Sequence, residues 1–210
     1  MDQIIMGRLL DQIKAVNTNY PTLQLDEKSF TLSGRLDVDD HDHFFVEIDC
    51  RPWVLRRFPR VKETGGRIPP KAHRHIYTNT LTCCLTTRFM EEILVRTEIN
   101  TLEDFFREVL IPYFLRQIYY EVHGEYDEEL DHDTPGLLQS YGEVLGIQDL
   151  NILIPLMEDR VNGCRIGRNE PCYCGKGKLK KCKHRSGYEL FRLVPIEVIT
   201  ADLKLFKNYN

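Results

Sequence analysis

The stretch Cys172-Tyr173-Cys174-Gly175-Lys176-Gly177, followed by Cys182-Lys183-His184, places three thiols and one imidazole within thirteen residues. Three cysteines and one histidine are a standard ligand set of structural zinc sites, in which four ligands surround the ion at about 2.0 to 2.3 Å. Gly175 and Gly177 allow the tight backbone turn that such a loop needs. We therefore expect Zn²⁺ bound by Cys172, Cys174, Cys182 and His184. The alternative is a reduced, metal-free basic loop.

The segment around these cysteines, from Gly167 to Lys178, resembles the SEC-C motif, best known as the C-terminal zinc knuckle of the SecA translocation ATPase. The resemblance covers about twenty residues of this chain. In that family the last two ligands are adjacent, whereas Lys183 separates Cys182 from His184 here. The resemblance implies a small zinc knuckle with a closed ligand set.

Length and composition limit the class of protein. The chain has 210 residues, seven cysteines and a formal net charge of -4, which suits one full domain with a small appendage. The absence of a signal peptide, together with the seven cysteines, favours a reducing compartment, the cytoplasm, without disulfides. No apolar run approaches the roughly 20 residues that span a bilayer. The negative net charge argues against nucleic acid as the main partner.

Charge is unevenly distributed along the chain. Between Arg160 and Arg185 there are nine Lys or Arg residues and one acid, Glu170. Such a patch could meet phosphates or an acidic protein surface. It could equally be solvated and serve only to offset the negative charge of three metal-bound thiolates.

The first half of the chain shows a helix followed by strands. Apolar residues at helical spacing predict an amphipathic helix that ends near Asn17 and Pro21: Ile4, Ile5, Leu9, Leu10, Ile13 and Val16. Alternation within residues 30–38 and 44–48 predicts an antiparallel hairpin, and a third extended segment is expected from Trp53 to Val61.

Helices are expected in the second half. Asn100 and Glu103 suggest a capping box for a long helix that Pro112 should kink. A shorter helix is expected from Thr134-Pro135 to Gly146. The apolar final segment, from Pro195 to Asn210, should pack on the main domain as a short helix or strand.

A second group of reactive side chains lies in His73-Arg74-His75-Ile76-Tyr77-Thr78-Asn79-Thr80-Leu81-Thr82-Cys83-Cys84-Leu85. The order of helix, strand meander, proline-rich loop, histidine, cysteine and helices resembles that of ubiquitin-conjugating enzymes. Phe58-Pro59-Arg60-Val61 likewise resembles their Pro-Pro-Lys-Val strand. The resemblance implies an α+β fold, with a ubiquitin-conjugating-enzyme-like domain at 1–160 and the zinc knuckle and packing segment at 161–210.

More closely, the chain resembles the bacterial ubiquitin-conjugating-like (E2-like) proteins of short type II CBASS anti-phage systems. The shared segments are Arg74-His75-Ile76-Tyr77, Cys84-Leu85-Thr86-Thr87, Ile111-Pro112-Tyr113-Phe114 and Gly124-Glu125-Tyr126. The family's Asp-Gly before the cysteine is Asn79-Thr80 here, and the Pro-Asn of the eukaryotic enzymes is absent. The resemblance implies a cysteine that carries the C-terminus of a partner cGAS/DncV-like nucleotidyltransferase (CD-NTase) as a thioester and transfers it to an amine.

Two cysteines compete for the role of acyl acceptor. Counting from His73 favours Cys83, whereas the family's cysteine-leucine pair favours Cys84, which we expect. Neighbouring side chains of an extended segment face opposite sides, so only one thiol should be exposed and reactive; the alternative is that both are buried. His73 or His75 could lower the thiol pKa, position the loop or stabilise an oxyanion, or could only brace the loop.

Three functions of different classes are compatible with these motifs. The first is acyl transfer by the cysteine, and the second is non-catalytic binding of the partner's tail by the same fold. The third is a zinc-knuckle adaptor whose basic tail recognises nucleic acid or protein. The chain has no P-loop and no Gly-x-Gly-x-x-Gly motif after a strand, so activation of the acyl group must come from another protein.

Overall fold

The computed structural model describes residues 3–127 and 133–209 and has an α+β architecture. Its contacts divide the chain into two compact units. The first unit comprises Met1–Thr86 and Val95–Glu129, and the second comprises Thr87–Leu94 and Leu130–Asn210. The chain therefore enters the second unit twice.

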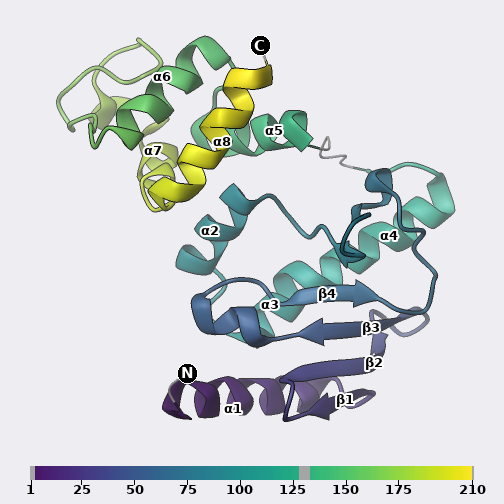
Figure 1. Cartoon of the computed structure of the whole chain (residues 1–210). Helices are drawn as coiled ribbons and strands as arrows, with labels where there is room; N and C mark the ends of the chain where they lie inside the picture. The colour runs from purple at the N-terminus through teal and green to yellow at the C-terminus, as the bar shows by residue number, and fades with distance from the viewer. Residues whose placement is uncertain (1–2, 128–132, 210) are drawn as a thin grey trace. The chain divides into compact units, whose positions relative to one another are not determined.

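A four-stranded antiparallel sheet forms the centre of the first unit. Its strands follow one another in the order β1-β2-β3-β4, which is a meander (Figure 1). Their bounds are Leu23–Asp26, Thr31–Asp37, His43–Asp49 and Arg60–Glu63. The expected hairpin is confirmed: Leu32 and Leu36 pair with Ile48 and Phe44, and all four side chains are buried.

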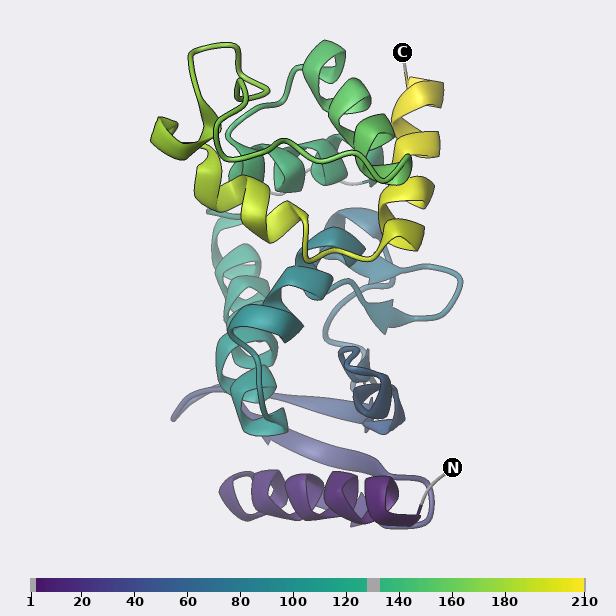
Figure 2. The same ribbon diagram turned by 90° about the vertical axis from the view of Figure 1, so that its left-hand side faces the viewer.

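Helix α1 (Gln3–Asn19) precedes the sheet, as expected, and contacts β1 (Figures 1 and 2). Its buried stripe consists of Leu9, Ile13 and Val16. Ile4 and Ile5 belong to the same sequence pattern but are 65% and 43% exposed. The apolar stripe is therefore shorter than the sequence pattern suggests.

The extended segment expected from Trp53 to Val61 is only partly extended. The 3-10 helix η1 (Arg51–Leu55) comes first, and β4 begins at Arg60. Pro52 lies in the first turn of η1, where its fixed φ favours a helix, and Trp53 is buried. The prediction was wrong here because Pro52 begins a helical turn rather than bordering a strand.

A small hairpin lies next to β4 and carries the two adjacent cysteines. It consists of β5 (Ile76–Tyr77) and β6 (Thr82–Cys83), preceded by the 3-10 helix η2 (Ala72–Arg74). The contacts of β6 with β4 place this hairpin beyond one edge of the main sheet. Cys84 follows β6 directly.

The long helix of the first unit has three parts: α3 (Leu102–Phe105), a π-helical segment η3 (Phe106–Leu110) and α4 (Ile111–His123). Its capping box is formed by Thr101 and Asp104, one residue later than expected. The irregularity expected at Pro112 lies just before it, because proline cannot donate the regular backbone hydrogen bond and the wider π turn accommodates its ring. Phe114 stacks on Phe44 at 4.5 Å between ring centroids, which places α4 against the sheet.

The second unit is helical. Its elements are α5 (Asp133–Leu145), α6 (Leu150–Val161), η4 (Leu179–Lys181), α7 (Arg185–Phe191) and α8 (Ile196–Tyr209), together with most of α2 (Arg88–Thr97). The helix expected between Thr134 and Gly146 is confirmed, and the final segment forms a helix of 14 residues. Within the described residues, no helix has both the length and the apolar character that crossing a membrane requires.

One core joins the metal-ligand loop to the helices of the second unit. Cys172 and Leu179 are buried together with Tyr141, Phe191 and Phe206. Residues 133–160, which we expected to belong to the first domain, therefore group with the tail. The expected boundary between residues 160 and 161 falls inside α6.

Candidate metal centre and reactive cysteine

The four expected zinc ligands lie together in the second unit. The ligand atoms of Cys172, Cys174, Cys182 and His184 all lie within 4.8 Å of one another. The Cys174 and Cys182 sulfurs are 3.5 Å apart, and the Cys182 sulfur is 3.2 Å from Nδ1 of His184. A tetrahedral zinc site with ordinary bond lengths has ligand-to-ligand distances of about 3.5 to 3.8 Å. The cluster therefore has the composition and size of a metal site.

The backbone of the loop explains how the first two cysteines converge. The amide of Cys172 donates to the carbonyl of Gly177 at 2.7 Å, and the amide of Gly175 donates to the carbonyl of Cys172 at 2.9 Å. Gly175 and Gly177 have φ values of +73° and +127°, which residues with a side chain rarely adopt. The two glycines thus permit the turn that the sequence predicts.

The loop is fastened to the end of α5. The Tyr173 hydroxyl donates to the Leu145 carbonyl at 2.7 Å, and Leu145 is the last residue of that helix. The final carbonyls of a helix have no partner within it, so this bond satisfies a group that would otherwise lack one. The residue between the first two ligands therefore connects the metal site to the helical core.

The thiols of Cys172 and Cys174 differ in character. A hydrogen bond from the backbone of Lys176 lowers the pKa of the Cys174 thiol. Cys172 is the buried member of the set, 3% exposed, and burial raises its pKa to about 12. A bound cation would stabilise both thiolates.

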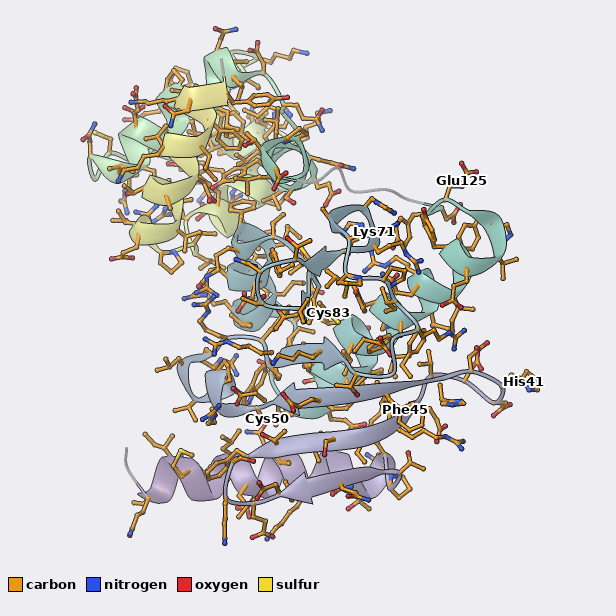
Figure 3. All side chains as sticks on the ribbon, turned by 45° about the vertical axis from the view of Figure 1, so that its right-hand side comes forward. His41, Phe45, Cys50, Lys71, Cys83 and Glu125 are labelled. Atoms are coloured by element: carbon orange, nitrogen blue, oxygen red, sulfur yellow. The ribbon has the colours of Figure 1, made fainter. Side chains whose placement is uncertain are left out.

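Cys83 and Cys84 occupy different environments in the first unit. Cys83 is 7% exposed, and burial raises the pKa of its thiol to about 12. Cys83 lies on β6 and is buried, whereas Lys71, in the loop before η2, is exposed (Figure 3). Cys84 is half-buried, and its thiol donates to the Tyr77 hydroxyl at 3.3 Å. Of the two, Cys84 is the thiol that a reagent can reach.

The backbone of His75 fixes the position of Cys84. The His75 carbonyl accepts hydrogen bonds from the Cys84 amide at 2.7 Å and from the Tyr113 hydroxyl at 3.1 Å. His75 adopts φ +50°, an uncommon conformation for a residue with a side chain, and its ring packs edge-on against Tyr126. The histidine thus contributes a carbonyl that holds the cysteine loop.

His73, the other expected histidine, is exposed on η2. Its ring centroid lies 6.4 Å from that of Tyr120 on α4. The structure thus places all four expected residues, Cys83, Cys84, His73 and His75, within one loop and hairpin.

No family model, curated protein or solved structure matches this chain. The function of both sites therefore has to be inferred from the chemistry of the residues that form them.

A buried polar network behind the cysteine loop was not anticipated from the sequence. Arg74 is 7% exposed, and its Nη2 donates to Oε1 of Gln117 at 3.0 Å. The Gln117 amide donates in return to the Arg74 carbonyl at 3.3 Å, and the Tyr126 hydroxyl donates to Gln117 Oε1 at 3.0 Å. The guanidinium also lies over the ring of Tyr120, 4.2 Å from its centroid. These contacts join the loop before Cys84 to α4.

One sequence feature could have revealed this network. Gln117 follows Tyr113 and Phe114 by four and three residues, so it lies on the apolar face of α4, and it is only 1% exposed. A polar side chain on an apolar helical face requires a buried hydrogen-bond partner. Nothing in the sequence shows that Arg74, forty-three positions earlier, is that partner.

Proposed function

We propose that this protein is an acyl carrier and transferase of the ubiquitin-conjugating type, with Cys84 as the acceptor thiol. The observation that carries the proposal is the difference between the two adjacent cysteines. Cys83 is buried, whereas Cys84 is accessible. One backbone hydrogen bond, to His75, and one side-chain hydrogen bond, to the Tyr77 hydroxyl, hold Cys84 in place. The first unit, with its N-terminal helix, four-stranded meander and cysteine loop beyond the last strand, supports this by its similarity to the order of elements in ubiquitin-conjugating enzymes.

The proposed reaction has two steps. The Cys84 thiolate attacks the carbonyl carbon of an activated acyl group, a thioester or acyl adenylate on another protein, and the donor thiol or AMP leaves. An amine then attacks the new thioester, forms an amide and releases the Cys84 thiolate. The donor brings the activation energy, and the amine loses its proton to solvent or to a nearby base.

Two neighbours of Cys84 would assist these steps. The Tyr77 hydroxyl, 3.3 Å from the sulfur, can donate a hydrogen bond to the thiolate once the thiol has lost its proton. The His75 carbonyl keeps the Cys84 backbone in place, so the sulfur approaches the acyl carbon from a fixed position. The imidazoles of His73 and His75 remain candidates for proton transfer.

The proposed acyl donor is the C-terminus of a partner CD-NTase, and the proposed setting is the bacterial cytoplasm, where free thiols persist. Both follow from the resemblance to E2-like proteins of CBASS systems. We propose that conjugation would regulate the partner enzyme during anti-phage defence.

For the second unit we propose that the ion is Zn²⁺ and that its role is structural. Three thiolates and one imidazole fill the four positions of a tetrahedral zinc ion and leave none for a substrate. Bound zinc would hold the loop that Tyr173 fastens to α5.

The experiment that tests the cysteine is intact-mass analysis without reductant after co-expression with the operon-neighbour nucleotidyltransferase. The wild type, Cys83→Ala and Cys84→Ala are compared. A thiol-labile adduct that Cys84→Ala alone loses supports the proposal. If all three chains form a noncovalent complex and no adduct, the protein binds the partner's tail without catalysis and the proposed transfer is wrong.

A further inference from the structure

The second unit contains a small hollow whose walls are mostly cationic. Its volume is about 180 Å³, and five of its nine lining residues are basic. These are Arg165, Arg168, Lys180, Arg185 and Arg192, with Glu189 as the only acid in the lining. They come from three separate segments: the loop before Cys172, η4, and α7 with the residue that follows it.

Most of this positive charge has no counter-charge in the protein. Glu189 pairs with Arg192 at 2.9 Å. Arg165, Arg168, Lys180 and Arg185 form no ion pair or side-chain hydrogen bond with any described residue in 3–127 or 133–209. Cations that converge in this way repel one another, so an anion bound in the hollow would lower this electrostatic repulsion.

Backbone contacts hold the three segments together. The Lys180 amide donates to the Arg168 carbonyl at 3.0 Å, and the Ile166 amide donates to the Tyr188 hydroxyl oxygen at 2.7 Å. Leu179, which forms part of the wall, is buried and belongs to the hydrophobic core. The backbone that carries the exposed cationic side chains is therefore held in place, which keeps the three segments together around the hollow.

We propose that this hollow binds the phosphoryl group of a small molecule, with Arg168, Lys180 and Arg185 as its main contacts. A phosphoryl group carries close to two negative charges at neutral pH and accepts several hydrogen bonds, which suits a hollow lined by unpaired guanidinium groups. A carboxylate would bring only one charge to the same set of cations.

A nucleic acid fits these observations less well. Over the whole chain, 32 acidic residues exceed 28 basic ones, and all the cationic residues that line the hollow lie between positions 165 and 192. Duplexes and long strands need a basic surface that follows the phosphate backbone over several nucleotides. A small hollow in a chain of negative net charge favours one compact anion. This proposal is independent of the reaction at Cys84.

The test is isothermal titration calorimetry of the full-length, zinc-loaded protein with inorganic pyrophosphate. The double variant Arg168→Gln/Lys180→Gln removes two cations of the hollow. The matched control, Lys181→Gln/Lys204→Gln, removes the same charge from exposed residues of the same unit that do not line the hollow. Equal zinc content and melting temperature in all three proteins show that the folds are intact, and Arg165→Gln serves as a second variant if the first is unstable.

We expect saturable binding by the wild type and the control, and binding at least about tenfold weaker in Arg168→Gln/Lys180→Gln, because charge-assisted hydrogen bonds are lost. Tighter binding of adenosine diphosphate than of pyrophosphate would support a nucleotide as the source of the phosphoryl group, and equal binding would support an inorganic one. The proposal is overturned if pyrophosphate does not saturate the wild type, if both double variants lose binding equally, or if only a DNA oligonucleotide binds.

Discussion

The imidazole of His184 occupies the space that a side chain on residue 146 would need. A Cβ built on Gly146 would lie 2.8 Å from Cδ2 of His184, closer than real contacts of this kind. Gly146 also has φ +70° at the end of α5, so the absence of a side chain serves both the helix end and the fourth residue of the candidate metal site.

Replacing Gly146 by alanine should therefore weaken metal binding as well as the fold. Gly163→Ala is a matched control, because Gly163 has φ +77° and no atom near the position of the added Cβ. Both variants incur the left-handed backbone penalty of roughly 1–2 kcal/mol. Only Gly146→Ala should also displace His184 and lose zinc to a competing chelator at lower chelator concentration. Equal zinc affinity of the two variants would show that His184 tolerates the added methyl group.

If zinc binds as proposed, its removal should loosen the whole second unit rather than the tail alone. The shared core of Cys172 and Leu179 with Tyr141 and Phe191 extends the expected effect to α5. Hydrogen exchange with and without chelator is the measurement: α5, α7 and α8 should lose protection, while β2 and β3 of the first unit keep theirs. Loss of protection throughout the sheet would contradict this expectation.

The two adjacent cysteines should differ sharply in alkylation. Burial raises the pKa of Cys83 to about 12, so this residue remains a protonated, shielded thiol at pH 8. Cys84 should react with iodoacetamide at a rate closer to that of Cys164, an exposed cysteine of the same chain that serves as an internal reference. Peptide mass spectrometry gives the rate at each site. Faster labelling of Cys83 than of Cys84 would reverse the assignment of the acceptor.

Removing the amide of Gln117 should disturb the cysteine loop from a distance. Gln117→Met leaves buried Arg74 without its hydrogen-bond acceptor, which we expect to cost about 3 kcal/mol or more. Arg116→Met changes an exposed position of the same helix and serves as the control. Urea unfolding measures the stability, and the alkylation rate of Cys84 reports the loop. A Gln117→Met protein as stable as the control would show that the network contributes nothing.

Asp202 should give the second unit an unusual pH dependence. Burial raises the pKa of this carboxyl to about 6, although the Tyr141 hydroxyl donates to it at 2.9 Å and Arg88 also favours its charge. Between about pH 4 and 6 the folded state holds a proton that the unfolded state has released, so stability falls as pH rises. Above pH 6, the raised pKa of this carboxyl lowers the free energy of unfolding by about 3 kcal/mol relative to its value below pH 4.

Asp202→Asn keeps an acceptor for Tyr141 and has no carboxyl to ionise. The stability difference between this variant and the wild type should therefore grow from pH 4 to pH 6 and then level off, as measured by urea unfolding across that range. Glu197→Gln, at an exposed position of α8, is the control and should show no such trend.

Patterns that local chemistry controls were predictable from the sequence. The alternation of Phe44, Val46 and Ile48 requires a strand with one buried face, and the metal-ligand cluster follows from the thiol and imidazole side chains and the two glycines. The capping residue was misplaced by one because Asn100 and Thr101 can both accept, and only the structure shows that Thr101 contacts Asp104.

Long-range relationships were not predictable in the same way. Which helices pack with the metal loop depends on contacts such as Tyr141 with Phe191 and Asp202, whose partners lie fifty or more positions away. The pairing of Arg74 with Gln117 is of the same kind. A single sequence shows that such residues need a hydrogen-bond or packing partner but does not show which residue that partner is.

Helix α2 has a consequence for synthesis of the protein. Phe89, in the part of α2 that belongs to the second unit, stacks on Tyr141 at 3.7 Å between ring centroids. Phe89 therefore leaves the ribosome about fifty residues before Tyr141 does. Until α5 has emerged, the apolar face of α2 has no native partner in its own unit. A nascent chain paused in this interval therefore exposes apolar surface that a holdase chaperone would bind.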